Sequence, residues 1–307
     1  MISPMTPARR NLVIVRAGDH SLHPEWLAGK EERSWDLIVN YYGDQKGLYL
    51  QPDVQRLDSK GPKWPALQLL LQKNPFFLSL YDYIWLPDDD LSATKSEINK
   101  LFALMKKHRL QAAQPSLEQS SYFSHLITIH NDHFQLRYTN FVEAMAPCFA
   151  SRLLTKAVPL LDSTPNSQGL DFIWSKLADQ PETQIAIIDN VQVRHTRPVE
   201  SRNNRPTRRK NTALPSEFQK FCKKHGLGDN PTPYILYATM RDGKGLDASN
   251  RPLSFALKVI DGYSKAKSRT PQRRLMRQSL WKIFKTGLKN SLISSKKMQN
   301  DTKGSKV

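Results

Sequence analysis

Apolar and polar positions alternate in blocks along the first two thirds of the chain. Runs rich in β-branched and aromatic residues at 11–18, 34–43 and 81–87 predict three strands. Between them, residues 63–74 have the apolar spacing of a helix, which must end before Pro75. Residues 94–108 predict a second, amphipathic helix, with Leu101, Leu104 and Met105 on one face.

The pattern continues through the next ninety residues. Residues 110–116 predict another short strand, and 124–132 and 134–146 predict two more strands or a hairpin. Residues 167–180 predict a helix, and 182–196 predict a strand pair or one bent strand. Strands that alternate with helices indicate an α/β domain with a mostly parallel sheet flanked by helices.

A polar, basic and proline-containing segment at 197–215 interrupts this pattern. We therefore expect a domain at 1–200, a basic linker at 201–215 and a basic, mainly helical C-terminal region at 216–307. That region has one candidate helix at 216–226 and a turn-rich segment at 240–252. An amphipathic helix is predicted at 273–293, and the tail after Ser294 is expected to be disordered.

The positive charge of the chain is confined to this C-terminal third. The net charge is +18, but residues 197–307 hold 26 Lys and Arg against 7 Asp and Glu, a net of +19. The first 196 residues hold 20 against 21, a net of −1. The basicity therefore carries no information about the partners of the α/β domain.

Composition also limits the compartment and the class of protein. Because the sequence has no run of about 18 apolar residues, we expect no membrane-spanning helix. It holds two cysteines, Cys148 and Cys222, which argues against a disulfide scaffold or a thiolate zinc site. The first residues lack the apolar stretch of a secretion signal. We expect a cytoplasmic protein.

The third predicted strand ends in three consecutive carboxylates, Asp88, Asp89 and Asp90. Adjacent carboxylates repel one another, and a divalent cation offsets that repulsion. Ligands bind at the carboxyl ends of strands in α/β sheets. Asp88 and Asp90 stand two apart, so both project to one side of an extended segment. They are candidate ligands of Mn²⁺ or Mg²⁺, although a solvated acidic turn explains the triplet equally well.

Three further residues could complete a site. His195 ends the last apolar strand of the domain and could ligate the metal or contact a phosphate, or it could simply face solvent. Asp171 lies in the first turn of a helix, where it either favours the helix dipole or acts as a general base. Glu143 is a charge within an apolar stretch, so it is either paired or directed into the site.

Weaker candidates lie near the strand ends. Arg16, Asp44 and Lys63 follow or end predicted strands on the side where a nucleotide would bind, although each is more often an ordinary surface charge. Trp174 could stack on a sugar, as could Trp64 and Trp85, but core packing is the default role of tryptophan.

Six separated segments together resemble a known family. They are KWPALQLLL, DYIWLPDDDL, QAAQPSL, FVEAMAPCFASR, GLDFIW and IAIIDNVQVRHTRPV, in that order, within residues 10–200. This order is similar to that of the family named as domain of unknown function 707. That family resembles nucleotide-sugar-dependent glycosyltransferases of the GT-A fold. Residues 201–307 have no counterpart in the resemblance.

The resemblance implies a role for individual residues. Asp88 and Asp90 match an Asp-x-Asp motif that holds Mn²⁺ or Mg²⁺ against a donor diphosphate, and His195 matches a late histidine on the metal or diphosphate. Asp171 matches the base of inverting enzymes. The implied donor is a nucleotide sugar, most simply a UDP-sugar, and the acceptor a saccharide or lipid-linked sugar. In this scheme the donor contacts are Arg16, Asp44, Lys63 and Asp89, and the acceptor contacts are Glu143 and Trp174.

Two other interpretations stay open. The sequence Asp88-Asp89-Asp90-Leu91-Ser92 also resembles an aspartyl-phosphate phosphatase motif, but that motif normally follows the first strand of its domain. The C-terminal region could alternatively make this a basic binding protein. No nucleic-acid-binding motif occurs, so we do not expect nucleic acid as a partner. The predicted helix at 273–293 pairs a cationic face with leucines and aromatic residues, which suits an anionic membrane surface, and the protein could be peripheral on its inner face.

Overall fold

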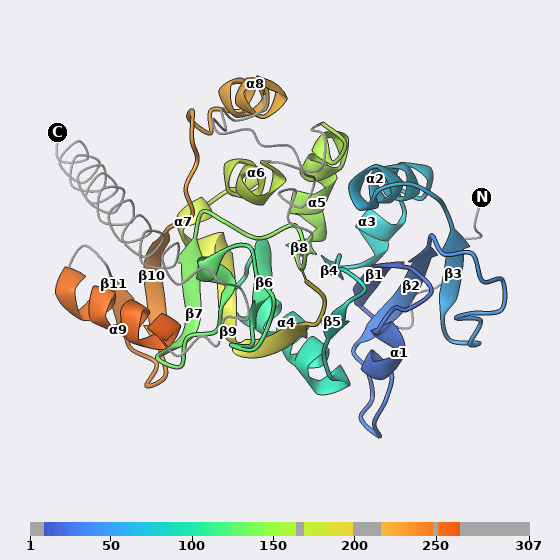
Figure 1. Cartoon of the computed structure of the whole chain (residues 1–307), viewed down its shortest axis with the longest axis horizontal. Helices are drawn as coiled ribbons and strands as arrows, with labels where there is room; N and C mark the ends of the chain where they lie inside the picture. The colour runs from blue at the N-terminus through green and yellow to red at the C-terminus, as the bar shows by residue number, and fades with distance from the viewer. Residues whose placement is uncertain (1–8, 164–168, 199–215, 248–250, 265–307) are drawn as a thin grey trace.

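The computed structural model describes residues 9–163, 169–198, 216–247 and 251–264. Their core is one large mixed sheet with the order β11-β10-β7-β9-β6-β8-β4-β1-β2-β3, and the short β5 pairs with β9 away from that path. Helices cover both faces of this sheet (Figure 1). The predicted α/β fold class is confirmed.

The N-terminal half of the sheet is parallel. It comprises β1 (Asn11–Ala17), β2 (Trp35–Tyr41), β3 (Gln55–Asp58) and β4 (Tyr83–Trp85). Alternate residues of β1 point to opposite faces of the sheet and belong to two different hydrophobic cores. Leu12 and Ile14 pack under α2 (Lys63–Lys73), α3 (Phe77–Leu80), α5 (Ser151–Ala157) and α6 (Leu170–Leu177). Val13 and Val15 pack under α1 (His23–Trp26) and α4 (Lys95–Lys107).

The other half of the sheet mixes directions. The strand β6 (Ala112–Leu117) is parallel to β9 (Ile185–His195), whereas β8 (Cys148–Ala150) is antiparallel to both β4 and β6. The strand β7 (Phe134–Thr139) is antiparallel to β9. It follows that β1, β4, β6 and β9 all end at the same edge of the sheet. Three single-turn elements connect these strands, at Leu126–Thr128, Val158–Leu160 and Pro181–Gln184 (α7).

β9 is the bent strand that the sequence allowed. Its register with β6 shifts between Pro115 and Ser116. Beyond the shift its end crosses to β5 (Leu91–Ser92), where Leu91 pairs with His195 in antiparallel register. This bend places the end of β9 directly beside the acidic triplet.

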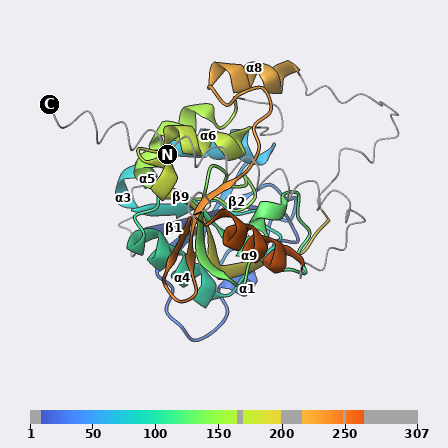
Figure 2. The same cartoon turned by 90° about the vertical axis from the view of Figure 1, so that its left-hand side faces the viewer.

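The described part of the C-terminal region extends the same sheet. The strands β10 (Ile235–Met240) and β11 (Gly245–Asp247) form a hairpin, and β10 is antiparallel to β7. The helices α8 (Ser216–Lys224) and α9 (Pro252–Ser264) lie on opposite sides of the sheet (Figure 2). The expected mainly helical extension thus contributes strands as well. The division at residues 1–200, 201–215 and 216–307 stays a prediction, and the helix expected at 273–293 lies outside the described residues.

No helix within the described ranges has the length and apolar character needed to cross a bilayer.

Candidate functional site

The ends of three parallel strands converge at one edge of the sheet. Arg16 is near the end of β1, Asp88 lies three residues beyond β4, and His195 is the last residue of β9. A parallel bridge joins the backbone of Arg16 to that of Asp88. The topology therefore brings together side chains that are up to 179 residues apart in the sequence.

Asp88 is held by a lysine. Its Oδ1 accepts a hydrogen bond from Lys63 Nζ at 2.6 Å, and the same ammonium donates to the carbonyl oxygens of Ala144 (2.9 Å) and Met145 (3.3 Å). The backbone N–H of Asp88 also donates to Met145 O. Desolvation raises the pKa of Asp88, and the charge of Lys63 opposes that rise. Lys63, expected as a donor contact, thus joins the acidic triplet to the 143–145 segment.

Asp89 links the triplet to the end of β1. Its Oδ2 accepts from the backbone N–H of Gly18 at 2.7 Å, and its Oδ1 lies 3.2 Å from Arg197 Nη1. A side chain at position 18 would displace the Tyr42 ring, because an added Cβ would lie 2.8 Å from it. The carboxylate is buried, which raises the pKa of Asp89. Asp89 therefore fixes the turn after β1.

Asp90 meets His195 where β5 pairs with β9. Asp90 Oδ2 lies 3.1 Å from His195 Nε2, and His195 Nδ1 lies 2.9 Å from the carbonyl oxygen of Tyr122. Burial of the ring disfavours its charge, but the hydrogen bond and the charge of Asp90 outweigh that effect and raise the pKa of His195. The other oxygen of Asp90, Oδ1, is buried and has no hydrogen-bond partner within the described residues.

Arg16 is a buried cation, only 4% exposed, beside the triplet. Its guanidinium donates to Asn40 Oδ1 at 2.7 Å, to Ser59 Oγ at 2.8 Å and to Gly61 O at 2.7 Å. None of the acidic side chains in the described ranges forms an ion pair with it, and its Nε has no partner there. Burial lowers the pKa of Arg16. A buried positive charge without a counter-ion favours a bound anion.

Glu143 and Asp171 are linked to Lys63 through Ala144, whose carbonyl oxygen accepts from Lys63 and whose N–H donates to Asp171. Asp171, in the first turn of α6, accepts a hydrogen bond at Oδ1 from Ala144 N (2.6 Å). Glu143 is 8% exposed, its N–H donates to Gln114 Oε1 at 2.5 Å, and its Oε2 is buried without a partner among the described residues. Desolvation raises the pKa of Asp171 to about 6. Desolvation and the nearby Asp171 raise the pKa of Glu143 to about 8.

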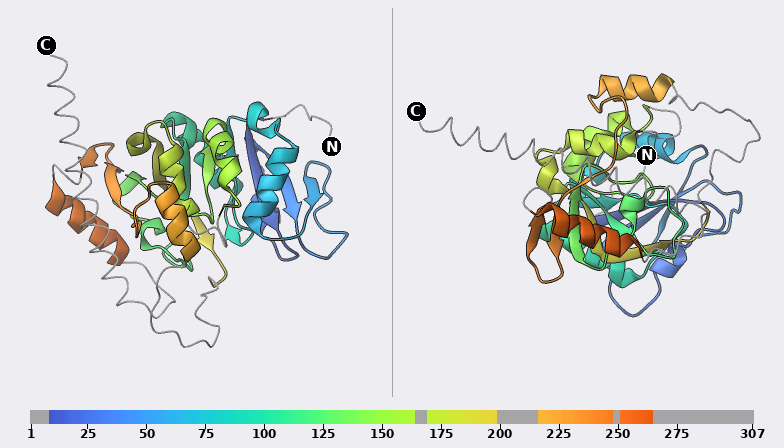
Figure 3. Two further views of the ribbon diagram at one scale, coloured as in Figure 1. Left: turned by 90° about the horizontal axis from the view of Figure 1, so that it is seen from above. Right: turned by 60° about the vertical axis from the view of Figure 1, so that its left-hand side comes forward.

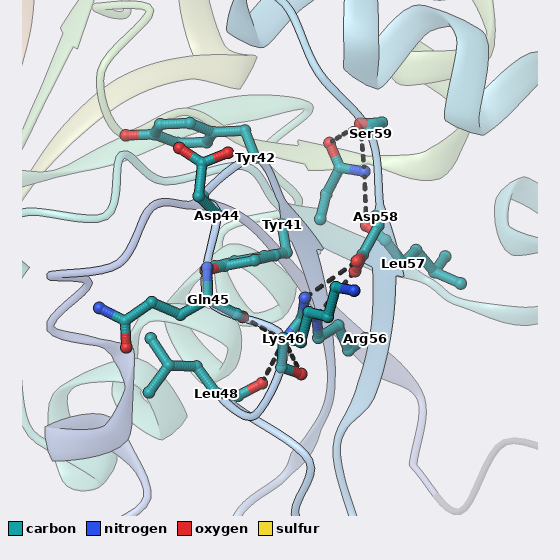
Figure 4. A network of polar contacts seen from close by, with 12 residues as sticks. Tyr41, Tyr42, Asp44, Gln45, Lys46, Leu48, Arg56, Leu57, Asp58 and Ser59 are labelled. Atoms are coloured by element: carbon teal, nitrogen blue, oxygen red, sulfur yellow. Dashed lines mark hydrogen bonds and ion pairs between the residues drawn. The ribbon is translucent and has the colours of Figure 1, made fainter.

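Two further expected site residues have surroundings of different kinds. Asp44 lies in the loop after β2 (Figure 4). Its side chain is 92% exposed and pairs with Lys60 at 2.8 Å. Trp174 is fully buried in the core against Trp64 and Phe149, and its Nε1 donates to Val142 O at 3.1 Å. Because its ring has no exposed surface, the expected sugar-stacking role of Trp174 is not supported. Trp174 is a core residue in the structure, which is the default role of tryptophan.

Other residues contribute to the site without having been singled out from the sequence. Arg197 pairs with Asp89 and also donates to His20 O, although from the sequence it was only the first residue of the basic segment 197–215. The Tyr42 ring lies under Arg16, with 5.0 Å between the guanidinium carbon and the ring centroid. Gln114 is fully buried and orients Glu143. The one local signal was the cluster of basic residues around His195.

A small cavity of about 260 Å³ opens beside His195. It is lined by Ser120, Tyr122, Arg194, His195 and Thr196. Its hydroxyl, imidazole and guanidinium groups can hydrogen-bond a polar ligand. The cavity is therefore a candidate position for part of a substrate next to Asp90.

The fit of this site to a divalent cation is partial. The unpartnered Oδ1 of Asp90 is the kind of ligand that Mn²⁺ and Mg²⁺ prefer. Asp88, by contrast, is occupied by Lys63. No three His, Cys, Asp or Glu side chains of the described ranges are grouped so as to hold a metal ion. A cation here would need ligands from a bound substrate or from water.

Comparisons with known proteins give low similarity. Among curated proteins, no sequence matches this chain. The structure of S. aureus TarS 1-349 in complex with UDP-GlcNAc has a TM-score of 0.46 and 11% identity, covering 86% of this chain and 74% of that one. GalNAc-T7 with UDP, GalNAc and Mn²⁺ has a TM-score of 0.45 and 8% identity, covering 62% and 44%. A structure of S. aureus TarS has a TM-score of 0.40 and 11% identity, covering 60% and 36%.

In several of these comparisons the matched part is less than two thirds of the other protein, 36% for that TarS structure and 44% for GalNAc-T7. The sequence comparison is more local. The family described as "Protein of unknown function (DUF707)" matches residues 61–140, which confirms the resemblance over the segment that holds Lys63 and the Asp88–Asp90 triplet.

Proposed function

We propose that this protein is a metal-dependent glycosyltransferase that takes its sugar from a nucleotide sugar, with a UDP-sugar as the simplest donor. The observation that carries the proposal is the buried, unpartnered Oδ1 of Asp90 beside His195. This carboxylate oxygen is shielded from water, and no hydrogen-bond donor within the described residues contacts it. Such an arrangement costs free energy unless a ligand completes it.

The second support is the placement of charge around the triplet. Arg16 is a buried cation without an acidic partner in the described residues, and Arg197 and Lys63 flank Asp89 and Asp88. A diphosphate bound at this edge of the sheet would be neutralised by these cations. A divalent cation shared between Asp90 and that diphosphate would stabilise the negative charge of the leaving group, with the Asp88 oxygen that Lys63 does not contact as a further ligand.

For the acceptor we propose that Asp171 acts as the base, as the resemblance implies. With a pKa of about 6 its carboxylate is ionised at neutral pH and can take a proton from an attacking hydroxyl. The Ala144 N–H holds its Oδ1 in place. Inversion at the anomeric carbon follows if Asp171 is the base. Glu143 lies next to Ala144 and is proposed to contact the acceptor.

The acceptor is proposed to be a saccharide or a lipid-linked sugar. The cavity beside His195 has the polar lining that hydroxyl groups need. A cytoplasmic enzyme at the inner face of a membrane would meet both a nucleotide sugar and a lipid-linked acceptor. The aspartyl-phosphate alternative has less support, because Asp88 follows β4 in the interior of the sheet and is preceded by three strands.

The test is a thermal-shift screen of nucleotide sugars with and without Mn²⁺. A ligand that binds the folded protein raises its melting temperature by mass action. We expect a shift with a nucleoside diphosphate sugar and Mn²⁺ together, a smaller shift with either alone, and loss of the shift in Asp90→Ala. Release of the nucleoside diphosphate on adding saccharide acceptors then reports transfer. No shift with any donor, or an unchanged shift in Asp90→Ala, would refute the proposal.

A further inference from the structure

The helix α9 presents two different apolar faces. One face is buried against the sheet through Phe255, Ala256, Val259 and Tyr263. The other carries Leu253, Leu257 and Ile260, which are 72%, 58% and 48% exposed. Their spacing of four and three residues places them in one stripe along the helix. Single exposed leucines are ordinary, whereas a continuous exposed apolar stripe indicates an interaction surface.

This stripe sits on a firmly attached helix. Tyr263 accepts a hydrogen bond at Oη from the buried Arg137 at 2.5 Å, and Asp261 Oδ2 lies 2.6 Å from His133 Nε2. Asn131 Nδ2 donates to the carbonyl oxygen of Lys258 at 3.3 Å. These contacts fix the rotation of α9 about its axis. The orientation of the stripe away from the sheet is therefore set by the fold.

α9 also lies at an end of the molecule, beside β10 and β11 and far from β3 (Figures 1 and 3). The chain that follows it is strongly cationic. Residues 265–307 contain 13 Lys and Arg and a single acidic residue, Asp301. An apolar stripe and a dense positive charge are thus adjacent in the chain. Each of them alone has many possible partners, but together they match an anionic lipid surface.

We propose that α9 forms a membrane-binding face, in which Leu253, Leu257 and Ile260 enter the interfacial region of an anionic bilayer. The positive charge of residues 265–307 attracts the protein to the lipid headgroups, and the stripe adds apolar contact that a polycation lacks. Binding then requires both features. This inference is independent of the glycosyltransferase proposal, since none of these residues belongs to the candidate site.

The experiment is vesicle co-sedimentation with the full chain. Vesicles of phosphatidylglycerol and phosphatidylcholine are compared with vesicles of phosphatidylcholine alone. We expect the wild type to bind only the anionic vesicles. We expect the triple variant Leu253→Ser, Leu257→Ser and Ile260→Ser to have an affinity for these vesicles that is lower by about tenfold or more. The matched control is Leu69→Ser, because Leu69 on α2 is also 48% exposed but lies on a different helix.

Each outcome decides the matter. Wild-type binding that is lost in the triple variant and kept in Leu69→Ser supports the proposal. No binding by the wild type overturns it, as does equal binding by the triple variant, which would assign the effect to charge alone. A wild type that is dimeric by light scattering and a triple variant that is monomeric, with no vesicle binding by either, would assign the stripe to self-association. If the triple variant does not fold, Leu253→Ser alone, at the most exposed position, gives the same comparison.

Discussion

Asp90 and His195, 105 residues apart in the sequence, face each other across the antiparallel pairing of β5 and β9, with 3.1 Å between Oδ2 and Nε2. This contact uses one carboxylate oxygen and leaves Oδ1 buried and without a partner among the described residues. The bend in β9 is what makes the contact, since its end leaves β6 to pair with β5. The sheet thus gives the two oxygens of Asp90 different surroundings: Oδ2 contacts His195, and Oδ1 has no partner in the part of the chain that the structure describes.

Asp90→Asn tests the role of the Asp90 charge, because asparagine has nearly the same shape as aspartate. The amide removes the negative charge that would hold a cation against a diphosphate, so we expect affinity for UDP in the presence of Mn²⁺ to fall about tenfold or more. Isothermal titration calorimetry measures it. The control is Asp82→Asn, because Asp82 precedes β4 at the opposite edge of the sheet and pairs with the exposed Arg10. Equal affinity in Asp90→Asn and wild type would remove Asp90 from the site.

Glu143 should make stability depend on pH. Its folded pKa of about 8 lies above its ordinary value of 4.5, so the folded state binds its proton more tightly than the unfolded chain does. Its stabilising contribution is complete below pH 4.5 and is lost as the pH rises through 8. Glu143→Gln cannot ionise at this position. As the pH rises from 5 to 9, we therefore expect its free energy of unfolding to increase by on the order of 2 to 4 kcal/mol relative to that of the wild type.

Urea unfolding at several pH values, with a chelator present, measures this difference. The control is Glu25→Gln, since Glu25 is exposed on α1. We expect that substitution to leave the pH dependence of the wild type as it is. A Glu143→Gln protein whose free energy of unfolding keeps the wild-type slope between pH 5 and pH 9 would contradict the assignment.

Local patterns predicted the elements well where one sequence window contains the cause. The helix α4 begins at a capping box between Thr94 and Glu97, and its apolar face follows the spacing of Leu101 and Met105. The strands β1 and β2 are buried along almost their whole length and contain the apolar runs 12–15 and 37–39, because both faces of the sheet are covered. The pairing of β10 with β7 was not predictable in this way, because it joins segments about 100 residues apart.

The same distinction applies to the site. Asp88 and Asp90 were recognisable because three carboxylates at a strand end are unusual in any context. Trp174 had no local signal that separated a core ring from a binding residue. Arg197 was recognisable only as the first residue of the basic segment 197–215, whereas its ion pair with Asp89 depends on the return of β9 to the triplet. Long-range pairing, which no window contains, decided these cases.

The buried pair of Arg137 and Asp189 should be a major determinant of stability. Both side chains are fully buried, and two hydrogen bonds of 2.6 and 2.8 Å join them. Arg137→Met would leave the Asp189 charge buried without its guanidinium partner, so we expect the free energy of unfolding to fall by about 3 to 5 kcal/mol. Urea denaturation measures it. Arg10→Met, which breaks the exposed pair with Asp82, is the control and should change stability far less. Similar losses in both variants would contradict this account.

Gly262 of α9 packs directly against Asn131, in the loop before β7. A Cβ at this position would overlap the side chain of Asn131, which in turn donates to the Lys258 carbonyl oxygen. Gly262→Ala must therefore displace either the helix or Asn131, and we expect the free energy of unfolding to fall by about 1 to 3 kcal/mol. The control is Gly47→Ala, because nothing lies within 4 Å of a Cβ there. Thermal and urea unfolding measure both. Since alanine favours a helix over glycine, a more stable Gly262→Ala protein would mean that α9 is not packed as closely on Asn131 as the structure has it.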